Sequence, residues 1–105
     1  MKQYDWAGAE ADYQAAIRRN PHDATAHLWY NVFFTSQRRW REAATQLDEA
    51  VAIDPLSPVI HSNLGDLRCA QGDFTGALPH FDEALRFAPG YYAAMVGKVM
   101  CLVEI

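Results

Sequence analysis

Residues that could perform chemistry recur in this chain at one fixed distance. His27 and His61 stand 34 residues apart, and so do the Asp-Glu pairs at 48–49 and 82–83. Histidines could bind a metal ion or respond to pH, and paired carboxylates could act as general acid and base. Recurrence at one period favours a structural interpretation instead, with the histidines as partly buried fillers and the acids on a solvated outer face.

The remaining reactive groups lack the arrangement that catalysis requires. Ser36, Ser57 and Ser62 have no histidine and acid placed to activate a nucleophile, the six glycines are scattered, and no HExxH or paired Cys/His spacing occurs. Cys69 and Cys101 form no CxxC motif and are interpreted as small core residues in a reducing cytosol. We therefore expect a protein without enzymatic activity, cofactor or metal.

Composition and charge narrow the possible partners. The 105 residues are 50% apolar and 21% charged, as is usual for a folded soluble domain. A formal charge of −4 disfavours nucleic-acid binding, and the short basic run at 38–41 is typical of a solvated helix end. No apolar stretch is long enough to cross a membrane or to act as a secretion signal. We therefore expect a cytoplasmic protein that binds neither nucleic acid nor membrane.

A 34-residue period organises the whole chain. Pro21, Pro55 and Pro89 are separated by this distance, and each follows a similar pattern of small and large apolar residues. Small residues along one helical face let a neighbouring helix approach closely, and the large residue locks between them. Such self-similarity indicates a repeat architecture. The equivalent positions are Ala9/Ala43/Ala77, Tyr13/Leu47/Phe81, Ala16/Ala50/Ala84, Ile17/Val51/Leu85 and Trp6/Trp40/Phe74.

The apolar pattern within each period predicts helices and no strands. Apolar residues recur at i, i+3, i+4 and i+7 in three segments that each end before a proline, and the segments between them are also long and apolar enough for helices. Asp23 and Ser57 are expected as N-caps, and Gly72-Asp73 as a stop followed by a cap. The expected helices are 6–19, 23–37, 40–53, 58–71, 74–87 and 91–104.

Pro79 falls one turn into the expected helix at 74–87. A proline is tolerated among the first four residues of a helix, because their amides have no helical partner. If Thr75 were the N-cap of this helix in place of Asp73, Pro79 would lie among these first four residues and would be tolerated.

These features resemble the tetratricopeptide repeat family. The unit at 58–91 matches the family pattern best, and the unit at 24–57 matches more loosely, with Tyr30, Asn31 and Phe34 in place of the usual Leu-Gly…Tyr. The segments HLWYN and IDPLSPVI are similar, more distantly, to repeat segments of bacterial regulatory proteins. The matching positions of the best unit are Leu64, Gly65, Gly72, Phe74, Ala77, Phe81, Ala84 and Pro89.

The resemblance implies an all-α fold, an antiparallel helix-pair solenoid of six helices with two full repeats flanked by half repeats. It implies a single domain at 1–105. This domain contains the second helix of a repeat at 3–20, full repeats at 24–57 and 58–91, and the first helix of a further repeat at 92–105.

In this family the first helices of successive units line a concave groove that binds partner proteins. Some members grip a peptide carboxylate with cationic groove residues, but those positions are uncharged here and only Asn63 matches, so this mode is not expected. An apolar groove favours an extended or helical segment with hydrophobic anchors. Trp29 is expected to be either the main contact or a core residue. The expected partner-groove residues are Thr25, Leu28, Trp29, Val32, Ser62, Asn63 and Asp66.

The segment at 91–105 suggests a second hypothesis. It carries two charges, Lys98 and Glu104, and its apolar side chains would normally pack on a second helix of their own unit. Uncovered, they would expose roughly several hundred Å² of apolar surface, more than a soluble monomer usually shows. The alternative to peptide binding is therefore a self-associating or scaffold segment of a larger regulator, dimerising through its terminal helices. The expected self-association residues are Met95, Val96, Val99, Met100, Leu102 and Val103.

Overall fold

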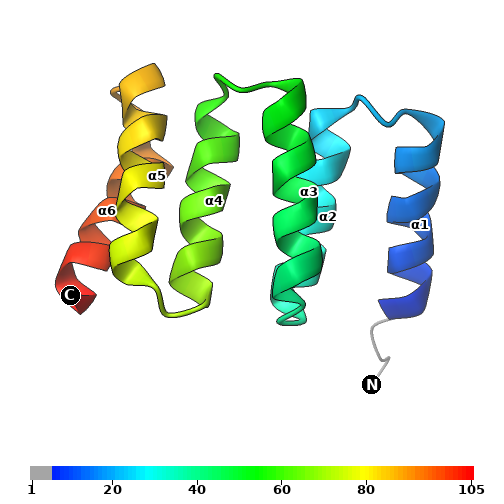
Figure 1. Ribbon diagram of the computed structural model, residues 1–105, viewed down its shortest axis with the longest axis horizontal. Coiled ribbons are helices and arrows are strands. Elements are labelled where there is room, and N and C mark those ends of the chain that lie inside the picture. Colours follow the sequence, from blue (N-terminus) through cyan, green and yellow to red (C-terminus); the bar gives the residue numbers. More distant parts are fainter. Residues whose placement is uncertain (1–5) are drawn as a thin grey trace.

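The computed structural model describes residues 6–105, which form six α-helices and no strand over that range (Figure 1). The predicted all-α fold is confirmed, and each predicted helix lies within one residue of its observed bounds. Residues 3–5 of the predicted first repeat helix lie outside the described range. The helices are α1 (Trp6–Arg19), α2 (Ala24–Ser36), α3 (Trp40–Ile53), α4 (Pro58–Ala70), α5 (Phe74–Phe87) and α6 (Tyr92–Glu104).

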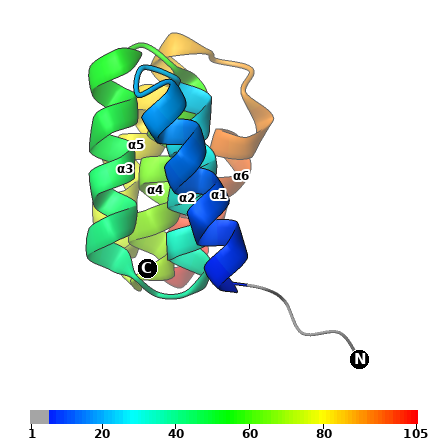
Figure 2. The same cartoon turned by 90° about the vertical axis from the view of Figure 1, so that its right-hand side faces the viewer.

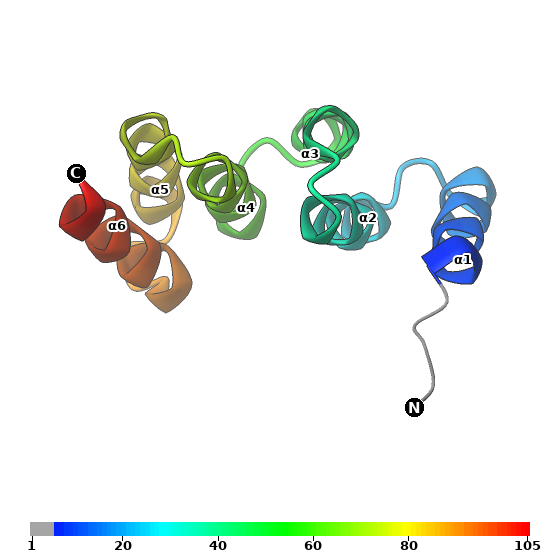
Figure 3. The ribbon, with the colours of Figure 1, turned by 90° about the horizontal axis from the view of Figure 1, so that it is seen from below.

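The helices from α2 onward alternate between two layers. Seen from below, α3 and α5 lie on one side, and α2, α4 and α6 lie on the other (Figure 3). The end-on view agrees, with α3 and α5 on the side opposite α6 (Figure 2). Consecutive helices contact one another along the chain, and α4 also contacts both α2 and α6. Helix pairs thus stack in sequence, each stabilised by its neighbours, as in a solenoid.

The core consists of the residues that recur along the chain. The small-large-small residues of α3 and α5 have no exposed surface: Ala43, Leu47, Ala50, Ala77, Phe81 and Ala84. Helix α1 carries the same pattern but contains no buried residue, and its Ala16 is exposed. It packs on α2 through aromatic rings, with Tyr13 stacked on Tyr30 at 5.3 Å between centroids. The small-large-small residues are therefore fully buried only in α3 and α5, which each pack between two neighbouring helices.

Phe81 of α5 fills the seam between α4 and α6, where it faces one glycine of each helix. A Cβ atom at Gly65 would lie 2.7 Å from the Phe81 ring, and one at Gly97 would lie 2.5 Å from it. Such distances are too short for nonbonded carbon atoms, so a larger residue at either position would displace the ring or a helix. The two glycines therefore set how closely the three helices approach.

The predicted helix caps are confirmed. Asp23 accepts hydrogen bonds from two backbone amides at the start of α2, and Ser57 accepts one at the start of α4. Gly72 has a positive φ of 82° between α4 and α5, as a glycine stop requires. Asp73 then accepts a hydrogen bond from the amide of Gly76 and caps α5. These side chains satisfy amides that lack helical partners.

Thr75, the cap that would have placed Pro79 in the first turn of α5, does not begin this helix. The helix begins at Phe74, because the carboxylate of Asp73 is already placed to cap it. Pro79 consequently lies inside the helix, beyond the first turn, and cannot donate the hydrogen bond that the Thr75 carbonyl would otherwise accept. Helix α5 therefore tolerates a missing backbone bond.

Candidate partner-binding surface

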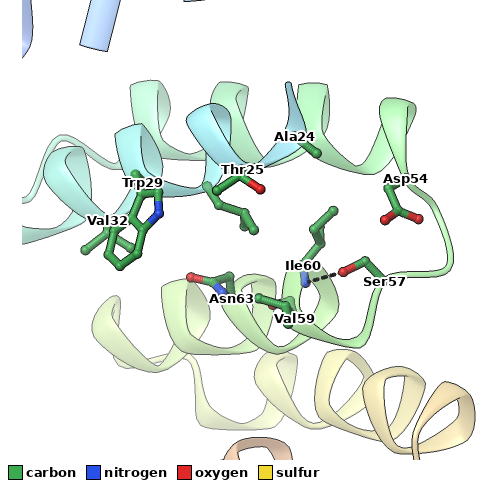
Figure 4. Close-up of a pocket in the computed structure, with 10 residues that line it drawn as sticks. Ala24, Thr25, Trp29, Val32, Asp54, Ser57, Val59, Ile60 and Asn63 are labelled. Atoms are coloured by element: carbon green, nitrogen blue, oxygen red, sulfur yellow. Dashed lines mark hydrogen bonds between the residues drawn. The ribbon is translucent and has the colours of Figure 1, made fainter. Parts of the chain in front are cut away.

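The layer of α2, α4 and α6 contains a groove between its first two helices. A pocket of about 370 Å³ opens there, and the side chains of both helices point into it (Figure 4). A second hollow of about 290 Å³ follows, and the two share Val32 and Asn63. We call this continuous surface the α2–α4 groove. Its lining residues are Ala24, Thr25, Leu28, Trp29, Asn31, Val32, Thr35, Ser36, Asp54, Ser57, Val59, Ile60, Asn63, Asp66 and Leu67.

Most of the predicted groove residues lie on this surface. Thr25, Leu28, Trp29, Val32 and Asn63 line the first pocket, and Asp66 lines the second. Ser62 was predicted to line the groove but does not, because its side chain is turned inward and only 3% of the residue is exposed. Successive helical residues point about 100° apart, so a neighbour of Asn63 need not share its face.

Trp29 belongs to the groove and not to the core. It is 59% exposed, and Val32 and Val59 are 45% and 40% exposed. Figure 4 shows Trp29 and Val32 on α2 facing Val59 and Asn63 on α4. An exposed aromatic ring beside aliphatic side chains is the kind of surface on which interface energy concentrates.

A polar network ties α2 to α4 beneath these apolar residues. The buried Asn31 donates from Nδ2 to Oδ1 of Asn63 at 3.2 Å and accepts from the hydroxyl of Thr35 at 3.2 Å. Asn63 in turn donates to the carbonyl oxygen of Val59 at 2.9 Å. A primary amide has two N–H groups, so Asn63 keeps one donor for a ligand. Sequence reasoning missed Asn31, since it stands where the family pattern has glycine.

The groove carries acidic charge. Among the residues that line it in the described part of the chain, Asp54 and Asp66 are ionisable and none is lysine or arginine. Desolvation raises the pKa of the Asp66 carboxyl above its usual range. A basic group placed beside Asp66 would favour the ionised carboxylate and would be attracted to this surface.

The two periodic histidines have equivalent structural contacts. Nε2 of His27 lies 2.8 Å from the carbonyl oxygen of Pro21, and Nε2 of His61 lies 2.8 Å from that of Pro55. His27 is buried, and its Nδ1 also lies 2.7 Å from the amide oxygen of Gln46. Each histidine thus ties a proline turn to the helix that follows it. The described residues contain no group of three or more His, Cys, Asp or Glu side chains that could hold a metal ion.

A further hollow of about 390 Å³ lies on the outer side, among α3, α4 and α5. Asp48, Arg68 and His80 line it together with apolar residues. Desolvation lowers the pKa of His80, with smaller contributions from Arg68 and His61, and so favours the uncharged ring. The opposite charges of Asp48 and Arg68 offset each other. This hollow lacks an exposed aromatic anchor, and we place the candidate site in the α2–α4 groove.

Helix α6 presents a second apolar surface. It packs inward through Ala94 and Cys101, which have no exposed surface. Its other side chains form a shallow hollow of about 260 Å³, lined by Tyr92, Met95, Val96, Val99 and Met100. The predicted self-association residues are all about half exposed or more: Met95 45%, Val96 42%, Val99 58%, Met100 58%, Leu102 55% and Val103 73%. None of the helices α1 to α6 is long and apolar enough to span a membrane.

Helix pairs stacked in two layers define a helical-repeat solenoid. The chain belongs to the tetratricopeptide repeat family, whose model matches residues 1–58 and 34–92. Tetratricopeptide repeats generally mediate protein–protein interaction, and the fold is typically non-enzymatic.

Several known proteins contain a similar segment. Protein FlbA of Caulobacter vibrioides is 31% identical over 67 residues, which are 64% of this chain and 11% of FlbA. TTC0263, a thermophilic tetratricopeptide repeat protein of Thermus thermophilus, superposes with a TM-score of 0.86 and 26% identity over 93% of this chain. PilW, a type IV pilus biogenesis factor, has a TM-score of 0.86 and 25% identity over 95%. The chain spans 50% and 47% of those two structures.

Proposed function

We propose that this chain is a non-catalytic, cytoplasmic interaction module that binds a peptide or helix of a partner protein in the α2–α4 groove. The observation that carries the proposal is Trp29, a 59% exposed tryptophan at an open pocket beside Val32 and Val59. A tryptophan in such a place costs a protein solubility unless a partner covers it. It also offers a large apolar contact with one donor group.

The lining of the groove supports one kind of ligand. Apolar side chains would cover Trp29 and Val32, and the free N–H of Asn63 would bond to a backbone carbonyl of the peptide. A lysine or arginine would pair with Asp54 or Asp66. The expected partner is therefore a short segment with hydrophobic anchors and a net positive charge. Nucleic acid carries the wrong charge for this surface.

Selection from a random peptide library followed by calorimetry tests this proposal. For a selected peptide, Trp29→Ala is expected to weaken binding about 30-fold, as loss of a contact worth about 2 kcal/mol requires. Leu56→Ala is the matched control, because Leu56 is 64% exposed but does not line the groove. It should leave the affinity within about two-fold of wild type. Equal affinities of the two variants would refute the assignment of the groove.

A second candidate function is favoured by α6. Its exposed apolar surface could pair with that of a second copy of the chain, which would make this segment a self-associating scaffold. Light scattering after size exclusion distinguishes the states, because the monomer is 11.8 kDa. A dimer that Val96→Asp with Met100→Asp converts to a folded monomer would support this function. A monomer at all concentrations would exclude it.

A further inference from the structure

The two cysteines lie together at the seam between α4 and α6. Their Sγ atoms are 2.8 Å apart, although the residues are far apart in the sequence. Cys101 has no exposed surface, and Cys69 is partly exposed. Each follows by four residues, or about one helical turn, the glycine that faces Phe81: Gly65 in α4 and Gly97 in α6. The two thiols therefore lie about one helical turn beyond the Phe81 ring, along the same contact between α4 and α6.

We propose that Cys69 and Cys101 are a reversible modification site, which a low-molecular-weight disulfide oxidises to an intramolecular disulfide joining α4 to α6. The bond requires a sulfur–sulfur distance of about 2.05 Å, so the two atoms need to approach by less than about 1 Å. Intracellular disulfides are usually transient and redox-sensing. Neither cysteine lines the α2–α4 groove, and the reaction requires no partner protein.

The exchange proceeds in two steps that balance. The partly exposed Cys69, as its thiolate, attacks one sulfur of the small disulfide, whose S–S bond breaks and releases one thiolate. Cys101 then attacks Sγ of Cys69, and the mixed disulfide releases the second small thiolate, which takes up the proton that Cys101 loses. The two protein thiols are oxidised by two electrons, and one small disulfide is reduced to two thiols. The reverse sequence restores the reduced chain.

The surroundings of Cys69 make this exchange slow near neutral pH. Desolvation, the hydrogen bond with Cys101 and the nearby Asp66 carboxylate raise the pKa of Cys69 to about 12. Because the thiolate is the attacking species, the initial rate should rise about tenfold for each pH unit between pH 7 and pH 9. Asp66 on α4 and Cys101 on α6 are the titratable groups that interact with Cys69 there.

The disulfide would fix the position of α6. This helix is held by its contacts with α5 and α4, and it carries the exposed apolar surface at Val96, Val99 and Met100. A covalent bond between Cys69 and Cys101 closes a long loop of the chain and restricts the unfolded state. Oxidation would thus stabilise the seam and hold the apolar surface of α6 in one orientation relative to the groove.

The test incubates the reduced chain with 2-hydroxyethyl disulfide and 2-mercaptoethanol at pH 8.5 and measures intact mass. The expected product is a monomer that has lost two hydrogen atoms and no longer reacts with iodoacetamide. Trypsin without reduction should yield the peptide 69–86 linked to the peptide 99–105, because Arg68, Arg86 and Lys98 define their ends. The oxidised chain should melt about 10–20 °C above the reduced chain.

Two variants keep the test decisive. Cys69→Ser alters the partly exposed member and should remain folded, yet should form no intramolecular disulfide and show no rise in melting temperature on oxidation. Cys101→Ala fills the fully buried position with a small apolar group and should stop the reaction at the mixed disulfide on Cys69. Recovery of unmodified dithiol, cross-linking only between molecules, or an oxidised chain that melts at or below the reduced one would overturn the proposal.

Discussion

The seam around Phe81 permits a quantitative prediction for Gly65→Ala. The new Cβ atom would lie 2.7 Å from the ring, which is overpacking of a kind that typically costs about 1–3 kcal/mol. Alanine also favours a helix by up to about 1 kcal/mol over glycine. Subtracting the second contribution from the first leaves a net loss of up to about 2 kcal/mol of unfolding free energy, with about 1 kcal/mol as the central value. For a chain of this size the central value lowers the melting temperature by about 5 °C.

Scanning calorimetry at pH 7 measures the change, and Gly90→Ala supplies the control. A Cβ atom at Gly90 would meet nothing within 4 Å, and its φ is not positive. Alanine there should leave the melting temperature unchanged or raise it slightly, because it restricts the unfolded chain. The contrast between the two alanines therefore isolates contact with the ring from any general effect of removing a glycine.

A double-mutant cycle with Phe81→Leu identifies the clashing partner. The smaller side chain leaves a cavity and should destabilise the protein by itself, but it also makes room for a methyl group at position 65. The cost of Gly65→Ala should therefore shrink or reverse in the Phe81→Leu background. A Gly65→Ala chain as stable as wild type, or an equal cost in both backgrounds, would refute the packing argument.

Two further predictions concern the turn between α2 and α3 and an ion pair. Arg38 has a positive φ of 60° at the position equivalent to Gly72, so Arg38→Gly should stabilise the chain by about 1 kcal/mol in urea unfolding; a lower midpoint would contradict this. The hydrogen bond from Arg39 lowers the pKa of Glu10, so this carboxylate stabilises the fold above its unfolded pKa, and its contribution is lost as pH falls through the folded value. Glu10→Gln should therefore lower the urea midpoint relative to wild type at pH 7 but not at pH 3. If Glu10→Gln lowers the midpoint by the same amount at both pH values, the ion pair does not stabilise the fold.

The sequence predicts the helices and turns well because residues within each repeat mark where its helices begin and end. Ala43, Leu47 and Ala50 recur as Ala77, Phe81 and Ala84, and both sets are fully buried. The turns are fixed by local chemistry, in prolines, a glycine and capping side chains. Thr75 as the cap would explain Pro79, which is unusual inside a helix, but the carboxylate of Asp73 decides where α5 begins.

The candidate site was less predictable, because helix periodicity gives a face but not the neighbours that cover it. The sequence is compatible with Trp29 in the core or on the surface, because the spacing of α2 and α4 decides between them. Ser62 is buried although its neighbour Asn63 lines the groove. The contact between Cys69 and Cys101 depends on how α6 packs against α4 and follows from no local motif. Sequence reasoning therefore assigned both thiols to packing alone.

The most direct test of the central claim maps a selected peptide onto the isotope-labelled chain by nuclear magnetic resonance. Binding in the α2–α4 groove predicts shifts of backbone amide signals in α2 and α4, together with a large shift of the Trp29 indole N–H signal. The Trp6 indole should shift little, since Trp6 belongs to α1 and does not line the groove. Shifts confined to α3, α5 or α6, with the Trp29 signal unmoved, would contradict the proposed function.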